Sequence, residues 1–135
     1  MTDSPNSGRR RRILLADDNE AIQEVVGRVA TKLGHVIVRA TSGAQALDLA
    51  AKEQPELIVL DIEFPDADGR DVLAKLKANQ LTAHIPVVVW SGRGVGASDS
   101  DNRIVRDLGA EDYMEKGNAN LLIRKLELIL LRLEG

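Results

Sequence analysis

Leu57-Ile58-Val59-Leu60-Asp61 is the most informative stretch of this sequence, because four large apolar residues in an unbroken run are followed at once by a carboxylate. Short solid apolar runs are typical of strands that are buried on both faces of a parallel sheet. Further strands are predicted at Ile13 to Ala16, ending at Asp17 and Asp18; at Val36 to Val38; at Ile85 to Trp90, ending at Ser91; and at Tyr113-Met114, ending near Lys116.

Segments with apolar residues at helical spacing separate these runs and follow the last of them. They are Ile22 to Leu33, stopped by Gly34; Ser42 to about Gln54, opened by a Ser42–Gln45 capping box; Val72 to Leu76; Ile104 to Leu108, after a loop at Gly92 to Ser100; and Leu121 to Leu133. Strands that alternate with helices predict a single α/β domain, with helices on both faces of a five-stranded parallel sheet. The rule for doubly wound sheets gives the strand order 2-1-3-4-5.

Length and composition narrow the classes of protein that fit. The chain has 135 residues, a net charge of -3 and no cysteine, which fits one globular domain without disulfides or thiolate metal sites. No apolar run approaches the ~20 residues of a membrane helix, and the polar start does not resemble a signal peptide. We therefore expect a cytoplasmic protein with a flexible tail at residues 1–11 and one domain at 12–134.

Polar residues stand at the ends of four predicted strands. The carboxyl ends of parallel strands meet at one edge of the sheet, so Asp17, Asp18, Asp61, Ser91 and Lys116 are expected to converge there. Carboxylates this close repel one another unless a hard cation or a proton compensates them, and Mg²⁺ suits oxygen ligands. Asp61, on the central strand, is then the candidate nucleophile toward phosphorus, with Ser91 and Lys116 holding phosphoryl oxygens.

Each of these residues also has a simpler interpretation. Asp18 or Asn19 can cap the following helix, Asp61 can mark a turn, and Lys116 can be a solvated lysine. These separate interpretations require four coincidences at the same ends of different strands, so the combined pattern favours a shared site.

The sequence resembles the receiver domains of two-component response regulators over about Arg12 to Glu134. The resemblance rests on Leu14 to Asn19, Leu57 to Asp61 with Pro65 and Asp68-Gly69, Pro86 to Ser91, Gly109-Ala110, Asp112-Tyr113 and Lys116. It implies a flavodoxin-like fold and phosphorylation of Asp61 by a sensor histidine kinase or a histidine phosphotransfer protein, with output to an unidentified protein target.

The resemblance also implies roles for individual residues. Asp17, Asp18, Asp61 and the backbone carbonyl of Glu63 would hold Mg²⁺ or Mn²⁺. Ser91 would move toward the phosphoryl group, Tyr113 would turn inward, and Lys116 would contact the phosphoryl oxygens.

Two residues at the predicted site have no settled role. Gly117 stands where the family usually has proline, and glycine permits a sharp bend without fixing it. The Glu63 side chain can pair with Lys116, orient a hydrolytic water, raise metal affinity or point to solvent.

Two surface features bear on partners. Leu121, Leu128 and Leu131 fall outside the sheet-facing side of the last helix, where Leu122, Ile123, Leu126, Ile129, Leu130 and Leu133 gather, so they are a candidate homodimer interface. Arg9 to Arg12 form a basic run without the aromatic residues or helix-turn-helix of a nucleic-acid site, and we interpret the run as solvated. No direct binding to DNA or membrane is expected.

Three functions remain open on the sequence alone. The favoured one is a stand-alone phosphorylation switch. The others are a receiver fold used as a phosphorylation-independent binding module and an aspartyl-phosphate phosphatase, which the small size disfavours.

Overall fold

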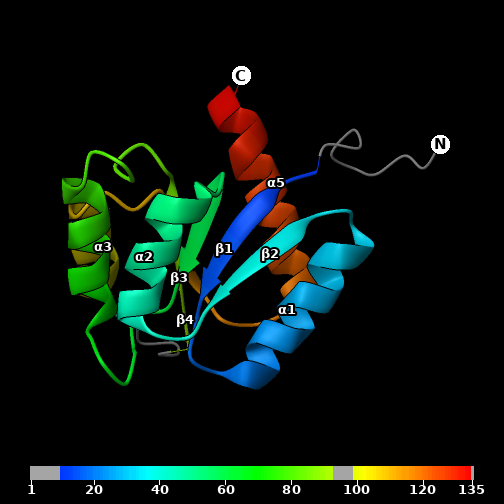
Figure 1. The fold of residues 1–135 in the computed structure, drawn as a ribbon, viewed down its shortest axis with the longest axis horizontal. Helices are drawn as coiled ribbons and strands as arrows, with labels where there is room; N and C mark the ends of the chain where they lie inside the picture. Colours follow the sequence, from blue (N-terminus) through cyan, green and yellow to red (C-terminus); the bar gives the residue numbers. More distant parts are fainter. Residues whose placement is uncertain (1–9, 93–98, 135) are drawn as a thin grey trace.

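The computed structural model describes residues 10–92 and 99–134 of the chain, in which strands and helices alternate (Figure 1). The strands are β1 Arg12–Ala16, β2 Val36–Ala40, β3 Leu57–Leu60, β4 Val87–Ser91 and β5 Asp112–Glu115. The helices are α1 Glu20–Lys32, α2 Gly43–Glu53, α3 Gly69–Ala78, α4 Asp99–Asp107 and α5 Ala119–Glu134. Residues 1–9 of the expected tail and most of the loop expected at 92–100 lie outside the described residues.

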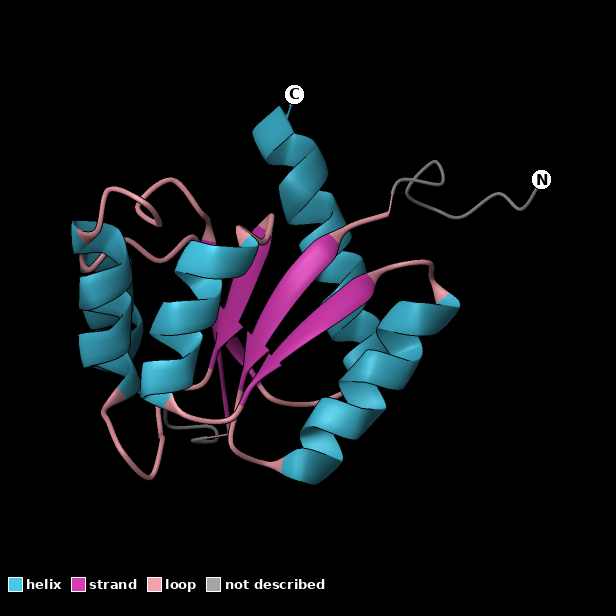
Figure 2. Cartoon of the chain, in the orientation of Figure 1, coloured by secondary structure: helices cyan, strands magenta, loops and turns pink. Residues whose placement is uncertain are grey.

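All strand pairs are parallel, and the order is β2-β1-β3-β4-β5, which confirms the predicted topology. β2 is two residues longer than the sequence indicated, because Arg39 and Ala40 continue the ladder opposite Leu15 and Ala16. The arrowheads of the strands converge at one edge of the sheet, the lower edge in Figure 2.

Helices cover both faces of the sheet, and each face has its own apolar core. Alternate residues of a strand point to opposite faces, so Leu14 and Leu60 pack with α2, α3 and α4, whereas Leu15 and Val59 pack with α1 and α5. The central strands β1, β3 and β4 are buried on both sides, as their continuous apolar runs predicted.

Side-chain caps fix where the helices begin. Asn19, rather than Asp18, is the N-cap of α1, and its Oδ1 accepts the backbone N–H of Ile22 at 3.0 Å. The side chain of Asp18, which follows Asp17 beyond the end of β1, is therefore not used as the helix cap. Ser42 caps α2 by accepting the backbone N–H of Gln45, as the sequence predicted.

Arg11 differs from the expectation for the basic run and for the tail. Its side chain is completely buried and forms ion pairs with Glu56 at 3.0 Å and with Glu134. Its backbone N–H donates to Nδ1 of His35, whose Nε2 lies 2.7 Å from Glu127. The solvated interpretation is therefore wrong for Arg11, because Glu56, just before β3, and Glu134, at the end of α5, compensate its buried charge.

The last helix follows the predicted pattern except near its end. Leu122, Ile123, Leu126, Ile129 and Leu130 are buried. Leu133, expected on the same face, is 47% exposed, and the end of α5 extends past the sheet (Figure 1). Leu121, Leu128 and Leu131 are exposed, as expected from the helical wheel.

Candidate functional site

The backbone ladder places two aspartates at the carboxyl edge of the sheet. The N–H of Asp17 donates to the carbonyl of Ala40 at 2.9 Å, and the N–H of Asp61 donates to the carbonyl of Ala16 at 3.0 Å. These bonds extend the pairing of β1 with β2 and β3 by one residue beyond the strands. Asp17 and Asp61 are consequently held side by side rather than on free loops.

Asp17, Asp18 and Asp61 form an acidic cluster. Each offers one carboxylate oxygen, and these oxygens all lie within 4.8 Å of one another. Asp17 and Asp61 are 1% and 7% exposed, whereas Asp18 is exposed. Buried carboxylates at this separation repel one another strongly, so a compensating cation is required to keep them ionised.

Lys116 supplies that compensation within the protein itself. Its Nζ lies 2.5 Å from Oδ2 of Asp17 and 3.2 Å from Oδ2 of Asp61. The same ammonium group lies 5.8 Å from the centroid of the Trp90 ring, a cation–π distance that the sequence did not indicate. One cation from the end of β5 thus bridges carboxylates that follow β1 and β3.

Gly117 does not prevent this placement of Lys116. The peptide bond between them is trans, as are all the others in the described residues. The backbone N–H of Lys116 donates to the carbonyl of Ser91 at 2.9 Å, which ties the lysine to the end of β4. That hydrogen bond positions Lys116 without the usual proline.

Burial and charge shift the ionisation of the two central groups. Burial raises the pKa of the Asp61 carboxyl, and the charge of Asp17 adds to that rise, while Lys116 and the N–H of Glu63 act in the opposite direction without cancelling it. Burial acts to lower the pKa of Lys116, but its hydrogen bond to Asp17 and the charges of Asp61 and Asp17 leave that pKa raised. Lys116 is therefore held in its charged form, while ionised Asp61 is partly disfavoured.

Ser91 and Tyr113 share one face of the sheet, but they are not directly opposite. Ser91 is buried at the end of β4 and is in register with Glu115, whereas Tyr113 is half-buried and in register with Val89. Tyr113 packs against the core between the sheet and helices α2, α3 and α4. Trp90 belongs to the core on the other face, with α1 and α5, as strand alternation predicted.

Glu63 contributes its backbone to the site. Its N–H lies 3.3 Å from Oδ1 of Asp61, and its side chain is exposed. The backbone of Glu63 also forms an isolated antiparallel bridge with Asp68, which closes the turn between β3 and α3.

Gln23, which was not among the predicted site residues, holds the ends of β1 and β2 together. Its buried Nε2 lies within 3.0 Å of the carbonyl oxygens of Leu15, Asp17 and Ala40. A helical wheel contains the signal, because Gln23 shares the buried side of α1 with Val26 and Ala30. A polar residue on a buried helix face requires buried partners.

Gly69, the first residue of α3, lies against the backbone that follows Asp61. A Cβ atom at this position would lie 2.3 Å from the carbonyl oxygen of Asp61 and 2.5 Å from Cα of Ile62. Only glycine permits α3 to start so close to the site.

This geometry agrees with a known family. The family described as the response regulator receiver domain matches residues 13–127 of the chain. The chain is a response regulator receiver domain. The acidic cluster of this receiver domain is typical of the Mg²⁺ sites of the family, and membership implies a histidine kinase as partner. Receiver domains are signalling switches rather than enzymes, which removes the phosphatase from consideration.

Two curated proteins are similar to this receiver domain over most of its length. It is 32% identical over 104 residues to the polar-differentiation response regulator DivK of Brucella ovis, covering 77% of this chain and 82% of DivK. It is also 32% identical over 117 residues to the gliding motility regulatory protein of Myxococcus xanthus, covering 87% of this chain but only 14% of that larger protein.

Solved structures share the fold. A CheY-like receiver domain protein of Methanospirillum hungatei has a TM-score of 0.82 at 26% identity, with 93% of this chain and 98% of that chain covered. Within residues 10–92 and 99–134, none of the helices has both the length and the apolar character that a membrane span requires.

Proposed function

We propose that this receiver domain is a Mg²⁺-dependent switch in which Asp61 accepts a phosphoryl group from a histidine kinase or a histidine phosphotransfer protein in the cytoplasm. The observation that supports the proposal most directly is the acidic cluster, with three carboxylate oxygens within 4.8 Å of one another and Lys116 bridging Asp17 and Asp61. Output is then by contact with another protein.

The donor set fits a divalent metal ion. Mg²⁺ holds oxygen ligands at about 2.1 Å, so oxygens that share one ion lie within about 4.2 Å of each other. A contraction of a few tenths of an ångström brings the oxygens of Asp17, Asp18 and Asp61 into that range, and we assign the backbone carbonyl of Glu63 as a further ligand. The ion, Mg²⁺ or Mn²⁺, would neutralise charge on the transferring phosphoryl group.

The residues of the chain divide the remaining work. A carboxylate oxygen of Asp61 forms the new bond to phosphorus while the bond from phosphorus to the donor nitrogen breaks, and the electron pair leaves with the imidazole. Lys116, already 3.2 Å from Asp61, moves its ammonium group onto the phosphoryl oxygens. The hydroxyl of Ser91 donates to another phosphoryl oxygen, and Tyr113 turns inward into the space that Ser91 vacates.

Intact-mass measurement tests the proposal. The protein is incubated with a small acyl phosphate and Mg²⁺, and we expect a mass increase of one phosphoryl group that is absent when the metal is chelated. If neither acyl phosphates nor a phosphorylated histidine protein gives an adduct, the chain is instead a phosphorylation-independent binding module.

We predict that Glu63→Ala changes the lifetime of the phosphorylated state. The exposed carboxylate of Glu63 is two residues from the acceptor, where it can orient water or compete for Lys116, so its loss should change the rate of dephosphorylation by about threefold or more. Decay of the adduct after removal of the donor measures this rate, with Glu24→Ala on α1 as a matched control. An unaltered rate would assign Glu63 to solvent.

We also propose that α5 contributes a homodimer interface through Leu121, Leu128 and Leu131. These leucines are 55%, 65% and 42% exposed, and seven-residue spacing places Leu121 and Leu128 on one stripe of the helix. Replacing Leu128 and Leu131 by Glu is expected to convert a dimer to a monomer in light scattering. A wild-type protein that is already monomeric, with or without phosphorylation, would contradict the proposal.

A further inference from the structure

β2 forms one edge of the sheet in the described part of the chain. The N–H of Val36 donates to the carbonyl of Arg11 at 2.8 Å, and the carbonyl of Ala40 accepts the N–H of Asp17. Backbone groups alternate in direction along a strand, so Val36, Val38 and Ala40 turn theirs toward β1. Ile37 and Arg39 therefore carry their N–H and C=O groups on the outer edge, where another strand can pair with them.

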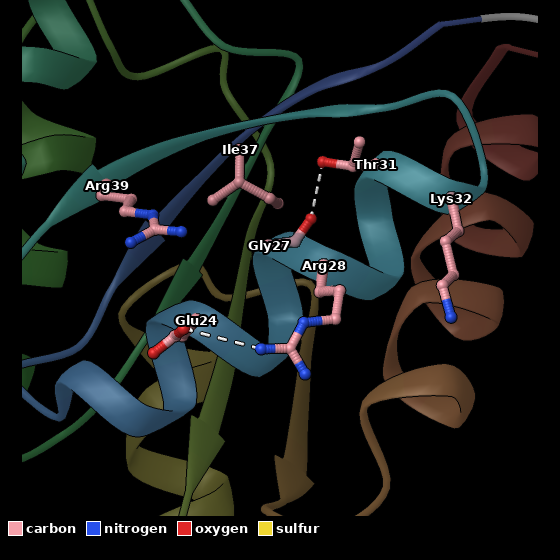
Figure 3. A pocket seen from close by; sticks show the side chains of 7 residues that line it. All are labelled: Glu24, Gly27, Arg28, Thr31, Lys32, Ile37 and Arg39. Carbon is pink, nitrogen blue, oxygen red and sulfur yellow. Dashed lines mark hydrogen bonds and ion pairs between the residues drawn. The ribbon is translucent and has the colours of Figure 1, made fainter.

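The side chains of the same two residues line a pocket between β2 and α1. The pocket has a volume of about 440 Å³, and Figure 3 shows Ile37 and Arg39 facing α1 across it. The remaining lining residues come from α1 and are Glu24, Gly27, Arg28, Thr31 and Lys32. Three cationic side chains thus stand against one acidic one, on a chain whose net charge is -3.

Gly27 makes room for the guanidinium group of Arg39. A Cβ atom at position 27 would lie 3.0 Å from Nη2 of Arg39. Glycine in the middle of a helix is less favourable than alanine, so Gly27 by itself destabilises α1. The gain is an arginine that lies along the helix, beside the open edge of β2.

The cations of this pocket are available to a partner. Arg39 is exposed, and neither Arg39 nor Lys32 has an acidic partner among the described residues. Arg28 forms an ion pair with Glu24 at 3.5 Å, in which both side chains are more than 60% exposed. Ion pairs of this kind are weak, so an incoming carboxylate can compete with Glu24.

We propose that the outer edge of β2 and this basic pocket form a docking site for an extended acidic segment of a partner protein. The segment pairs its backbone with Ile37 and Arg39 as an added strand, and it directs carboxylates toward Arg39, Arg28 and Lys32. Because alternate side chains of a strand share a face, acidic residues are required at every second position. The side chains between them lie on the α2 face, beside half-buried Val38, and are small or β-branched.

None of the pocket residues belongs to the acidic cluster around Asp61, so we expect this site to bind its partner without phosphorylation of Asp61. A labelled peptide of about seven residues in which Thr and Glu alternate is the probe. Fluorescence anisotropy at about 50 mM salt measures its binding to the full chain. A second peptide of the same composition, with its Glu residues in one block, has the same charge but cannot direct them to one face.

We expect the alternating peptide to bind about tenfold more tightly than the block peptide, and Arg39→Gln to weaken it by about fivefold. Arg124→Gln removes one positive charge from an exposed position on α5, as Arg39→Gln does on β2, and it should leave binding unaltered. Methylation of every second backbone nitrogen of the peptide should abolish binding if those nitrogens are the ones that donate hydrogen bonds to β2.

Equal binding of the two peptides, or no effect of backbone methylation, would show a diffuse basic surface and overturn the proposal. So would the absence of binding by a protein whose circular dichroism shows it to be folded.

Discussion

Asp61→Asn is expected to lose phosphoryl transfer completely while unfolding at a higher denaturant concentration than the wild type at neutral pH. The amide that replaces the carboxylate cannot form the acyl phosphate, so no mass increase should appear with an acyl phosphate and Mg²⁺. The gain in stability follows from burial, because Asp61 is 7% exposed and lies beside Asp17. Lys116 is not left alone, since its Nζ still lies 2.5 Å from Asp17.

The effect of Asp61 on stability has a defined dependence on pH. Folding raises the pKa of Asp61 above its unfolded value of about 3.9, so the native state holds the proton more tightly than the unfolded state. The wild-type free energy of unfolding therefore falls as the pH rises from the unfolded pKa through the folded one. Below about pH 4 both states are protonated, and the advantage of Asp61→Asn should disappear.

Urea denaturation at several pH values measures this difference, which we expect to be on the order of 1 kcal/mol at pH 7 without divalent metal. Asp18→Asn is the matched control, since Asp18 is exposed and its replacement should change stability much less. Added Mg²⁺ should stabilise the wild type more than Asp61→Asn. A phosphoryl adduct in Asp61→Asn would mean that another residue is the acceptor. A loss of stability at neutral pH would contradict the inference that the buried, ionised carboxylate of Asp61 destabilises the fold.

Gly69→Ala should have the largest effect on the fold among substitutions that leave every charged group in place. Its Cβ would lie 2.3 Å from the carbonyl oxygen of Asp61 and 2.6 Å from that of Ile62, so the backbone itself must move. Relief of such a clash costs about 3 kcal/mol or more, and it displaces either the start of α3 or the acceptor. We expect a lower midpoint in thermal and urea unfolding, together with slower phosphorylation.

Gly117→Ala is the comparison that isolates this steric effect. A Cβ atom at position 117 meets no atom within 4 Å, and Gly117 does not adopt the left-handed backbone conformation. Its replacement should change the free energy of unfolding by less than about 0.5 kcal/mol. Equal unfolding of Gly69→Ala and wild type would mean that α3 can shift away from β3 without loss of packing.

Much of the site followed from local pattern. Each apolar run is short and is followed by a polar residue, and a parallel sheet brings those ends to one edge, so Asp17, Asp61, Ser91 and Lys116 were predicted to meet there. The end of β2 was less predictable, because Arg39 is polar and belongs to an edge strand. Only its pairing opposite Leu15 shows that the strand continues.

The buried polar contacts were not predictable in the same way. Arg11 pairs with Glu134, 123 residues further along the chain, and Gln23 joins the ends of two strands. A basic run at the surface and a basic residue buried against acids have the same local sequence. The difference lies in which distant groups compensate the charge.

The local pattern of residues was enough to predict the alternation of strands and helices, their order in the sheet and the edge at which the acidic residues gather. These features follow from hydrophobic periodicity and from the geometry that parallel strands share. The folded arrangement was needed to show that Lys116 bridges Asp17 and Asp61, that Arg11 is buried and that Gly27 accommodates Arg39. Those outcomes depend on distances between residues far apart in the chain, and local periodicity carries no information about such distances.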